Sequence, residues 1–200
     1  MKLLATLTML LAGAATAQAA PEIYVIDSSQ TSSQFSYRYL GLANQTHRFE
    51  KISGRLVIDH AAKTGSAEVS IDATSVNTGY ALLDEQMQTA DFFDTANYPA
   101  ITFRSSKMTL NGDQSSLSGE LTIKGVTRPV TLTLTRFQCM QDATFNVDAC
   151  GASATVTVKR TDFNMGKYAF LASNEITLNL SVKAIKQQPY LQLASRDPIK

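Results

Sequence analysis

Apolar and polar side chains alternate with a period of two along most of this chain, which is typical of β-strands with one apolar and one polar face. In one of the clearest stretches, the apolar side chains of Val130, Leu132 and Leu134 are interleaved with threonines. The stretches that follow this pattern are residues 33–39, 54–59, 67–73, 101–103, 117–123, 130–135, 153–158 and 176–183. They predict an all-β fold of about eight strands.

A sheet with one apolar face must be covered, and the chain has too few helical residues to provide the cover. The sheet must therefore cover itself, either as a sandwich or as a closed barrel, and closure also removes exposed strand edges. The segments Asn111-Gly112-Asp113 and Lys124-Gly125-Val126 are typical of tight turns, which favours antiparallel neighbours. A barrel of about eight strands is either filled by its own side chains or holds one small ligand.

Residues 77–99 are the one stretch that departs from the strand pattern. Leu83, Met87 and Ala90 follow the i, i+4, i+7 spacing of one helical face, and so short a helix must rest on other elements to be stable. The stretch also brings aromatic rings close to carboxylates in the sequence, with Phe92, Phe93 and Tyr98 beside Asp84, Asp91 and Asp94. We expect a short helix and loop that form a lid near one end of the sheet, with Phe92 and Phe93 on its inner side.

The two ends of the chain read as separate segments. Lys2, an apolar run from Leu3 to Ala17 and the small-residue signal Ala17-Gln18-Ala19 predict a cleaved signal peptide over residues 1–19. The apolar run is too short to span a membrane, and no later stretch is long enough to do so. Residues 20–186 are then one domain, and residues 187–200 are a C-terminal tail.

Charge excludes some classes of partner. Without residues 1–19 the chain has 18 − 1 = 17 basic residues against 17 acidic residues, so its net charge is zero. No basic cluster indicates a nucleic acid or an anionic membrane surface as partner.

Cys139 and Cys150 lie on either side of a polar segment between two strands. Two cysteines in an exported chain predict a structural disulfide. A redox pair is the alternative, but the close C-x-x-C spacing that tunes a thiolate is absent from the sequence.

Catalysis is the weaker hypothesis for this sequence. His47 and His60 are the two histidines of the chain, and neither lies in a nucleophile motif or a zinc-ligand spacing. Asp84, Asp91 and Asp94 could be read as an acid/base pair or a calcium site, although acidic groups on a short surface helix are usually just solvated. We therefore predict no enzyme activity, no metal site and no cofactor other than a bound lipid or quinone.

Four segments that occur in order resemble the YceI-like family of exported polyisoprenoid-binding proteins. They are Tyr24-Val25-Ile26-Asp27, DFFDTANYP at residues 91–99, LTIKGVTRPVTL at 121–132 and KRTDF at 159–163. The resemblance extends to about Ala184. It implies an extended antiparallel lipocalin-like barrel with a long apolar cavity for an isoprenoid chain, in a carrier or storage protein. The predicted signal peptide indicates a periplasmic location.

The sequence departs from the usual family pattern at several polar positions. Gln30, Thr31 and Tyr39 stand where histidine or serine is common, and Leu83 stands in place of a frequent arginine. His47 and Asn164 occupy positions where glycine is usual, so the resemblance implies the barrel but leaves the identity of the ligand open.

The predicted ligand-binding residues combine inward-facing strand positions, the lid and one cation. They are Phe35, Tyr37, Tyr39, Phe49, Asp84, Phe92, Phe93, Tyr98, Phe103, Leu132, Val156, Arg160, Phe163 and Leu178. The inward apolar residues could instead only fill a core, and Arg160 could instead pair with Asp162 or a lid carboxylate.

Three functions stay open at this point. The leading hypothesis is a soluble periplasmic carrier of an isoprenoid or another long-chain lipid. The second is a hydrolase or isomerase that uses the lid carboxylates, and the third is a filled barrel that binds a partner protein. Formation of a homodimer is left open.

Overall fold

The computed structural model describes residues 20–187, with the exception of residue 145. The predicted signal peptide lies outside these residues, as does the predicted tail apart from Gln187.

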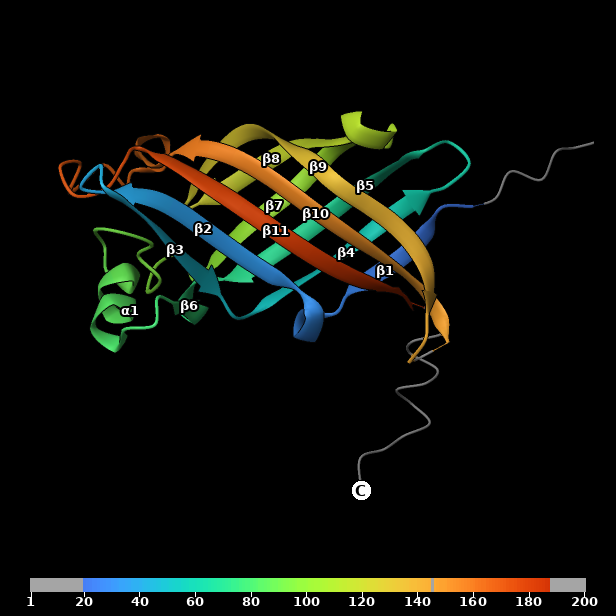
Figure 1. Cartoon of the computed structure of the whole chain (residues 1–200), viewed down its shortest axis with the longest axis horizontal. Coiled ribbons are helices and arrows are strands. Elements are labelled where there is room, and N and C mark those ends of the chain that lie inside the picture. Colours follow the sequence, from blue (N-terminus) through green and yellow to red (C-terminus); the bar gives the residue numbers. More distant parts are fainter. Residues whose placement is uncertain (1–19, 145, 188–200) are drawn as a thin grey trace, which may run out of the picture.

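One antiparallel sheet closes on itself (Figure 1). The closed ring runs in the order β1-β4-β5-β7-β8-β9-β10-β11, and β11 pairs with β1 to complete it. The strands are β1 (Glu22–Ile26), β4 (Ile52–Asp59), β5 (Thr64–Asp72), β7 (Ala100–Thr109), β8 (Ser116–Ile123), β9 (Val126–Asp142), β10 (Val147–Lys159) and β11 (Glu175–Lys186). This confirms the predicted all-β, eight-stranded antiparallel barrel.

Three further strands extend the ring toward one end of the barrel. They are β2 (Ser32–Tyr39), β3 (Ala43–Phe49) and β6 (Val76–Asn77). After short interruptions β2 follows β1 and β6 follows β5, whereas β3 precedes β4. The interruptions before β2 and before β6 are 3₁₀ turns, η1 (Ser28–Gln30) and η2 (Ala73–Ser75). Because β11 pairs with β2 over Thr177–Ser181 and with β1 over residues 184–186, β1 and β2 act as one interrupted strand.

The last strand of the extension, β6, is very short, and the lid covers the edge of the sheet beyond it. β6 contains only two residues, after which the chain leaves the sheet and returns at Ala100. This lid segment, residues 78–99, contains the short helix α1 (Ala81–Gln88). It lies at the end of the barrel opposite the N-terminal end of the described chain (Figure 1).

Two other connections meet the lid segment at this end. Lys124, in the β8–β9 turn, donates from Nζ to the carbonyls of Ala90 (2.6 Å) and Asn164 (3.1 Å). Asn164 belongs to the β10–β11 loop, residues 160–174, which begins with the 3₁₀ turn η4 (Arg160–Phe163). The lid segment is therefore fixed to the sheet and to this loop.

Turn chemistry agrees with the predicted antiparallel connections. Lys124 and Gly125 have φ of 50° and 72°, the left-handed pair that a two-residue hairpin requires. A Cβ atom on Gly125 would lie 2.5 Å from Cε1 of Tyr98, so glycine is also required by the close packing of the lid. At the other end of the barrel, Asn111 precedes the 3₁₀ turn η3 (Gly112–Gln114) between β7 and β8.

Several local expectations were incomplete or wrong. The strands β1 and β3 were not predicted from periodicity, and β9 and β10 extend well beyond the alternating stretches. The helix ends at Gln88, so Ala90 lies outside it and is exposed, contrary to the predicted helical face. Cys139 and Cys150 are register partners on β9 and β10 and are joined by a disulfide, as predicted.

Candidate functional site

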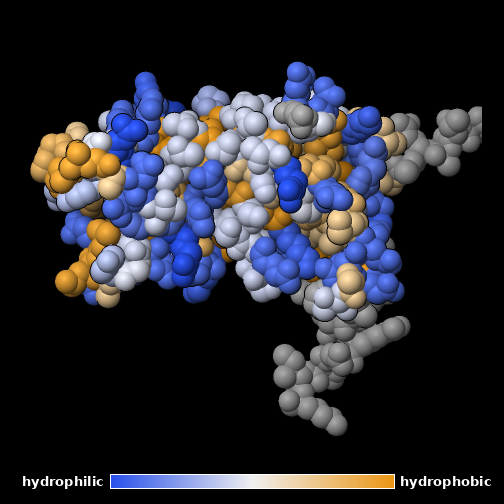
Figure 2. Space-filling model, in the orientation of Figure 1, coloured by the Kyte–Doolittle hydropathy of each residue, from blue (hydrophilic) through white to orange (hydrophobic). Residues whose placement is uncertain are grey.

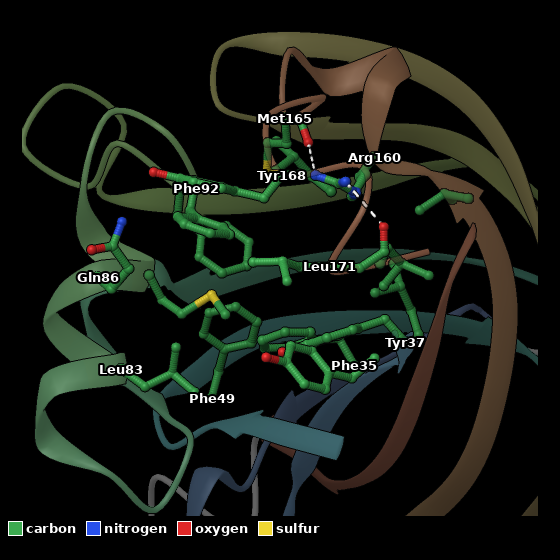
Figure 3. Close-up of a pocket in the computed structure, with 18 residues that line it drawn as sticks. Phe35, Tyr37, Phe49, Leu83, Gln86, Phe92, Arg160, Met165, Tyr168 and Leu171 are labelled. Carbon is green, nitrogen blue, oxygen red and sulfur yellow. Dashed lines mark hydrogen bonds between the residues drawn. The ribbon is translucent and has the colours of Figure 1, made fainter. Parts of the chain in front are cut away.

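A cavity of about 410 Å³ lies inside the barrel at the lid end (Figure 3). We call it the mouth cavity. Its walls come from β2, β3, β10 and β11, from the end of β8, from the lid segment and from the β10–β11 loop. The lining residues are Phe35, Tyr37, Tyr39, Phe49, Leu83, Gln86, Met87, Phe92, Phe93, Ile123, Val158, Arg160, Met165, Tyr168, Leu171, Ala172, Ile176 and Leu178. Most of this surface is apolar, and its volume is within the range of small-molecule sites.

Strand and helix periodicities aim these side chains into the cavity. On β2 the alternation turns Phe35, Tyr37 and Tyr39 toward the interior, whereas the intervening residues face outward. On α1 the i, i+4 pair Leu83 and Met87 lies on the cavity side, and Met87 is buried.

Two consecutive aromatic residues attach the lid segment to opposite walls. Phe93 packs edge-on against Phe35 and Phe49, with ring centroids 5.6 Å and 5.3 Å away. Phe92 instead stacks on Tyr168 of the β10–β11 loop, at 5.6 Å with an interplanar angle of 10°. Aromatic pairs at such distances stabilise by more than their buried area alone. The lid is thus clamped on two sides of the mouth cavity.

The lid carboxylates are engaged in holding local structure. Asp84 accepts hydrogen bonds from the backbone N and Oγ1 of Thr78, at 2.6 Å and 2.7 Å, and these bonds lower its pKa. Asp91 accepts from Lys167 Nζ at 2.8 Å and from the Tyr168 hydroxyl at 3.0 Å, and its pKa is lowered by the lysine first and the tyrosine second.

Asp94 accepts hydrogen bonds from Asn97 Nδ2 at 2.9 Å and 3.1 Å and adopts a left-handed φ of 50°. Each of the three acids therefore stabilises its own turn or an adjacent loop, and none of them lines the mouth cavity.

Arg160 is buried in the cavity wall, where it organises the β10–β11 loop. Its guanidinium donates hydrogen bonds to the carbonyls of Met165 and Ala172 (Figure 3). It also donates to the carbonyls of Lys167 and Ser173. Among residues 20–187 without 145, no carboxylate lies within ion-pair distance of it, so the alternative in which Arg160 pairs with Asp162 or a lid carboxylate is wrong. Burial lowers its pKa, and the guanidinium adds positive charge to an otherwise apolar wall.

His47 is the buried titratable group behind this wall. It lies on β3, opposite Phe35 in register, and only 5% of its surface is exposed. Its Nε2 lies 3.3 Å from the hydroxyl of Tyr37, and its Nδ1 has no hydrogen-bond partner in the described part of the chain. Burial lowers the pKa of His47, an effect opposed by the Thr78 backbone and by the charge of Asp84.

A second, smaller void of about 50 Å³, here called the inner void, lies deeper in the barrel. The predicted residues Phe103, Leu132 and Val156 line this inner void and not the mouth cavity. Phe49, Ile123 and Leu178 line both spaces. These three side chains therefore form the partition between them.

The remaining predicted residues lie outside both spaces. Asp84 caps the turn at Thr78, Tyr98 packs on Gly125, and Phe163 is buried in the core with 1% of its surface exposed.

Sequence reasoning missed part of the cavity wall. Val158 and Ile176 follow the strand alternation and could have been included from that signal. Met165, Tyr168 and Leu171 come from an irregular loop, where no periodicity indicates which side chains turn inward.

His60, Cys139 and Cys150 are the one group of described residues close enough together to hold a metal, but the disulfide occupies both sulfurs. None of the helices in the described ranges has the length and apolarity that a membrane crossing requires.

Comparison with known proteins points to one family. Residues 24–184 match the YceI-like domain. Protein YceI of Escherichia coli O157:H7 is 32% identical over 155 residues, which cover 77% of this chain and 81% of that protein. The crystal structure of BcnA from Burkholderia cenocepacia superposes with a TM-score of 0.70 at 25% identity, covering 79% of this chain and 98% of BcnA.

A polyisoprenoid binding domain from Saccharophagus degradans superposes with a TM-score of 0.59 at 20% identity, over 82% of this chain and 98% of that domain. At this identity the likeness shows a shared fold.

Proposed function

Because this chain belongs to the YceI-like family, we propose that it is a soluble periplasmic carrier of an isoprenoid or a similar long-chain amphiphilic lipid. The mouth cavity is the observation that carries the proposal. It offers about 410 Å³ of mostly apolar space inside a barrel that could otherwise have been filled by its own side chains. The isoprenoid class is suggested by the family and by the name of the Saccharophagus degradans domain that shares this fold.

The chemistry of the cavity wall supports an apolar ligand with a small polar head. Its polar groups are few: the hydroxyls of Tyr37, Tyr39 and Tyr168, the Gln86 amide and the guanidinium of Arg160. Burying a hydrocarbon chain against the remaining wall contributes roughly 25 cal/mol per Å² of apolar surface. Part of this is lost to the entropy of association, so a chain of a few isoprene units supports binding on the order of micromolar.

The length of ligand that the barrel accommodates depends on the partition formed by Phe49, Ile123 and Leu178. A short chain fits the mouth cavity, and a longer chain has to displace these side chains to enter the inner void. Conformational changes of single side chains on binding are common, so both cases are compatible with the same barrel.

We also propose that the protein acts by binding and not by catalysis. The three lid carboxylates that could serve as acid or base are each engaged in a turn or a loop contact. A hydrolase or isomerase would need a free acid/base group beside the ligand, and the carboxylates of the lid do not line the cavity. Incubation with isoprenoid esters and phosphates, followed by product analysis, tests this part. Turnover above the protein-free rate would overturn it.

Lipid extraction with native mass spectrometry tests binding. The purified protein should carry a lipid of fixed mass, or take up geranylgeraniol with one-to-one stoichiometry. Val158→Trp should abolish uptake because Val158 lines the cavity, whereas Thr157→Trp, on the outward face of the same strand, should not. Equal uptake by both variants, each confirmed as folded by circular dichroism, would show that the ligand is not in the mouth cavity.

A further inference from the structure

The mouth cavity is surrounded by exposed apolar side chains. The large hydrophobic residues that are exposed in the described part of the chain number nine. Seven of them lie at the lid end, and only Ile23 and Met140 lie toward the opposite end. Figure 2 shows strongly hydrophobic groups protruding at the end with α1, whereas the barrel wall is a mixture of hydrophilic, intermediate and hydrophobic residues.

Three separate turns supply the five most exposed of the seven residues at the lid end. The β2–β3 turn contributes Leu40 and Leu42, the start of the lid segment contributes Tyr80 and Leu82, and the β10–β11 loop contributes Phe170. We call these five residues the apolar rim. Their exposed fractions are 49%, 88%, 74%, 82% and 76% in that order, so they contribute little to the packing of the barrel.

The wall of the mouth cavity continues onto the rim. Leu83 and Leu171 line the cavity, and their neighbours Leu82 and Phe170 belong to the rim. The backbone N of Leu40 donates to the carbonyl of Leu171 at 2.7 Å, which joins the β2–β3 turn to the β10–β11 loop. A hydrocarbon chain that leaves the cavity over this edge therefore stays in contact with apolar side chains.

The rim turns also lack charge. Residues 40–44, 78–83 and 168–173 contain no Asp, Glu, Lys, Arg or His, in a chain in which 18% of the residues are charged. Charged groups resist transfer into a bilayer interface, and apolar and aromatic side chains favour it. Monomeric proteins rarely gather exposed apolar residues in one place without an interaction.

From these observations we propose that the apolar rim docks the mouth of the barrel onto a lipid surface, so that ligand passes between the bilayer and the cavity without crossing water. The inference rests on the proposed function, because the ligand class is what places the partner in a bilayer. A lipid surface fits better than one protein partner because the rim consists of single side chains on three turns around an opening. A docked protein would close that opening, whereas a bilayer is itself the source of the ligand.

Docking of this kind depends on apolar insertion and not on anionic lipid. The rim turns carry no cationic cluster, and the nearby Lys167 is paired with Asp91 at 2.8 Å. We therefore expect association with zwitterionic phosphatidylcholine vesicles and little effect of added salt.

A flotation assay with the protein beginning at Ala20 tests the proposal. The triple variant Leu42→Ser, Leu82→Ser, Phe170→Ser should partition onto phosphatidylcholine vesicles at least tenfold less than the unchanged protein. The control variant Ile23→Ser, Met140→Ser removes exposed apolar residues from the other end of the barrel and should partition normally. The proposal would be overturned if the triple variant binds vesicles as well as the unchanged protein does. It would also be overturned if the unchanged protein does not bind vesicles.

A second measurement separates this inference from the proposed function. The residues changed in the triple variant do not line the cavity, so its equilibrium uptake of geranylgeraniol from solution should be unchanged. Its uptake of the same ligand from vesicles should be at least tenfold slower. If the triple variant and the unchanged protein take up the ligand from vesicles at equal rates, docking is overturned even if the carrier function holds. If the unchanged protein takes up no ligand from solution, the carrier function is overturned. The unchanged protein could instead form a dimer that the triple variant does not form, and bind no vesicles. That result would assign the rim to contact with a second copy of this chain and would overturn docking on a lipid surface.

Discussion

The guanidinium of Arg160 donates hydrogen bonds to four carbonyls in the part of the β10–β11 loop that follows the 3₁₀ turn η4. Removing the side chain leaves those carbonyls with fewer partners in a largely buried region. Because hydrogen bonds to a charged group contribute roughly 1.5–3 kcal/mol, Arg160→Met should lower the free energy of unfolding by about 3 kcal/mol. Arg160→Lys should not restore it, since one ammonium group cannot reach carbonyls spread around a planar fork.

Urea unfolding of the two Arg160 variants is the measurement. Lys159→Met, which removes an exposed neighbouring cation, is the matched control. A loss of ligand affinity with unchanged stability would instead indicate that Arg160 contacts the head group of the ligand.

His47 makes the stability depend on pH. Its pKa is lowered in the folded protein because the ring is buried, while in the unfolded chain it returns to about 6.5. Between these two values the unfolded state binds more protons, so the free energy of unfolding should decrease as the pH falls below about 6.5. At higher pH the ring is neutral in both states and the effect is absent.

Unfolding curves measured from about pH 8 to about pH 5 check this sign. His47→Phe should flatten the curve in that window, because it removes the buried ring whose pKa is lowered. A slope that survives in His47→Phe would show that another group is responsible.

At the scale of elements, the lid segment is held by aromatic contacts on two sides. Phe93 joins it to β2 and β3, and Phe92 joins it to the β10–β11 loop. Phe93→Ala should increase the rate of ligand release at least tenfold and change the rate of entry much less, because loss of a closing contact acts mainly on dissociation. Stopped-flow release of a fluorescent isoprenoid measures this, with the exposed Glu85→Ala on the same helix as control.

If both variants release the ligand at the rate of the unchanged protein, the lid does not retain it. Phe93 is also part of the core, so stability has to be measured in parallel, where a loss of about 3–5 kcal/mol is expected for a buried phenylalanine.

The disulfide joins β9 and β10 at the end of the barrel away from the lid. Closing a loop with a sequence separation of 11 contributes about 3 kcal/mol in the chain-entropy model. The double variant Cys139→Ser, Cys150→Ser should therefore melt at a lower temperature and keep its ligand affinity. An unchanged melting temperature, or two free thiols in freshly isolated protein, would contradict a structural role.

At the scale of the whole molecule, the barrel contains two spaces in line. The mouth cavity is wide, and the inner void of about 50 Å³ is nearly filled. Val156 lines only the inner void, so Val156→Phe should leave binding of farnesol unchanged and weaken binding of a long polyprenol at least tenfold. Thr157→Phe, on the outward face, is the control. Equal loss for both chain lengths would show that the two spaces act as one tunnel.

The sequence by itself determined that the sheet covers its own apolar face. Period-two alternation left most of the strands with one apolar face, and a chain with one short helix can bury those faces only in a sandwich or a closed barrel. The resemblance to the YceI-like family favoured the barrel. Local signals also determined the turns at Lys124-Gly125 and the existence of a helical lid. The pairing of the two cysteines followed from their number and from the predicted export of the chain.

Other strands gave weak signals for a physical reason. The strand β3 carries His47 inward, and its other residues are mostly polar, so it lacks the apolar alternation that marks a strand. Only its pairing with β2, in which Phe35 lies opposite His47, gives it strand geometry.

Tertiary structure alone decided the open volume and the role of the cation. Whether eight strands enclose a filled core or a cavity depends on how inward side chains of different strands meet, and alternation within one strand does not contain that information. The fate of Arg160 depended on carbonyls at residues 165–173, which approach it only when the β10–β11 loop folds back over the mouth. The local sequence determines on which face of a strand a side chain lies, and long-range packing determines which residues it contacts.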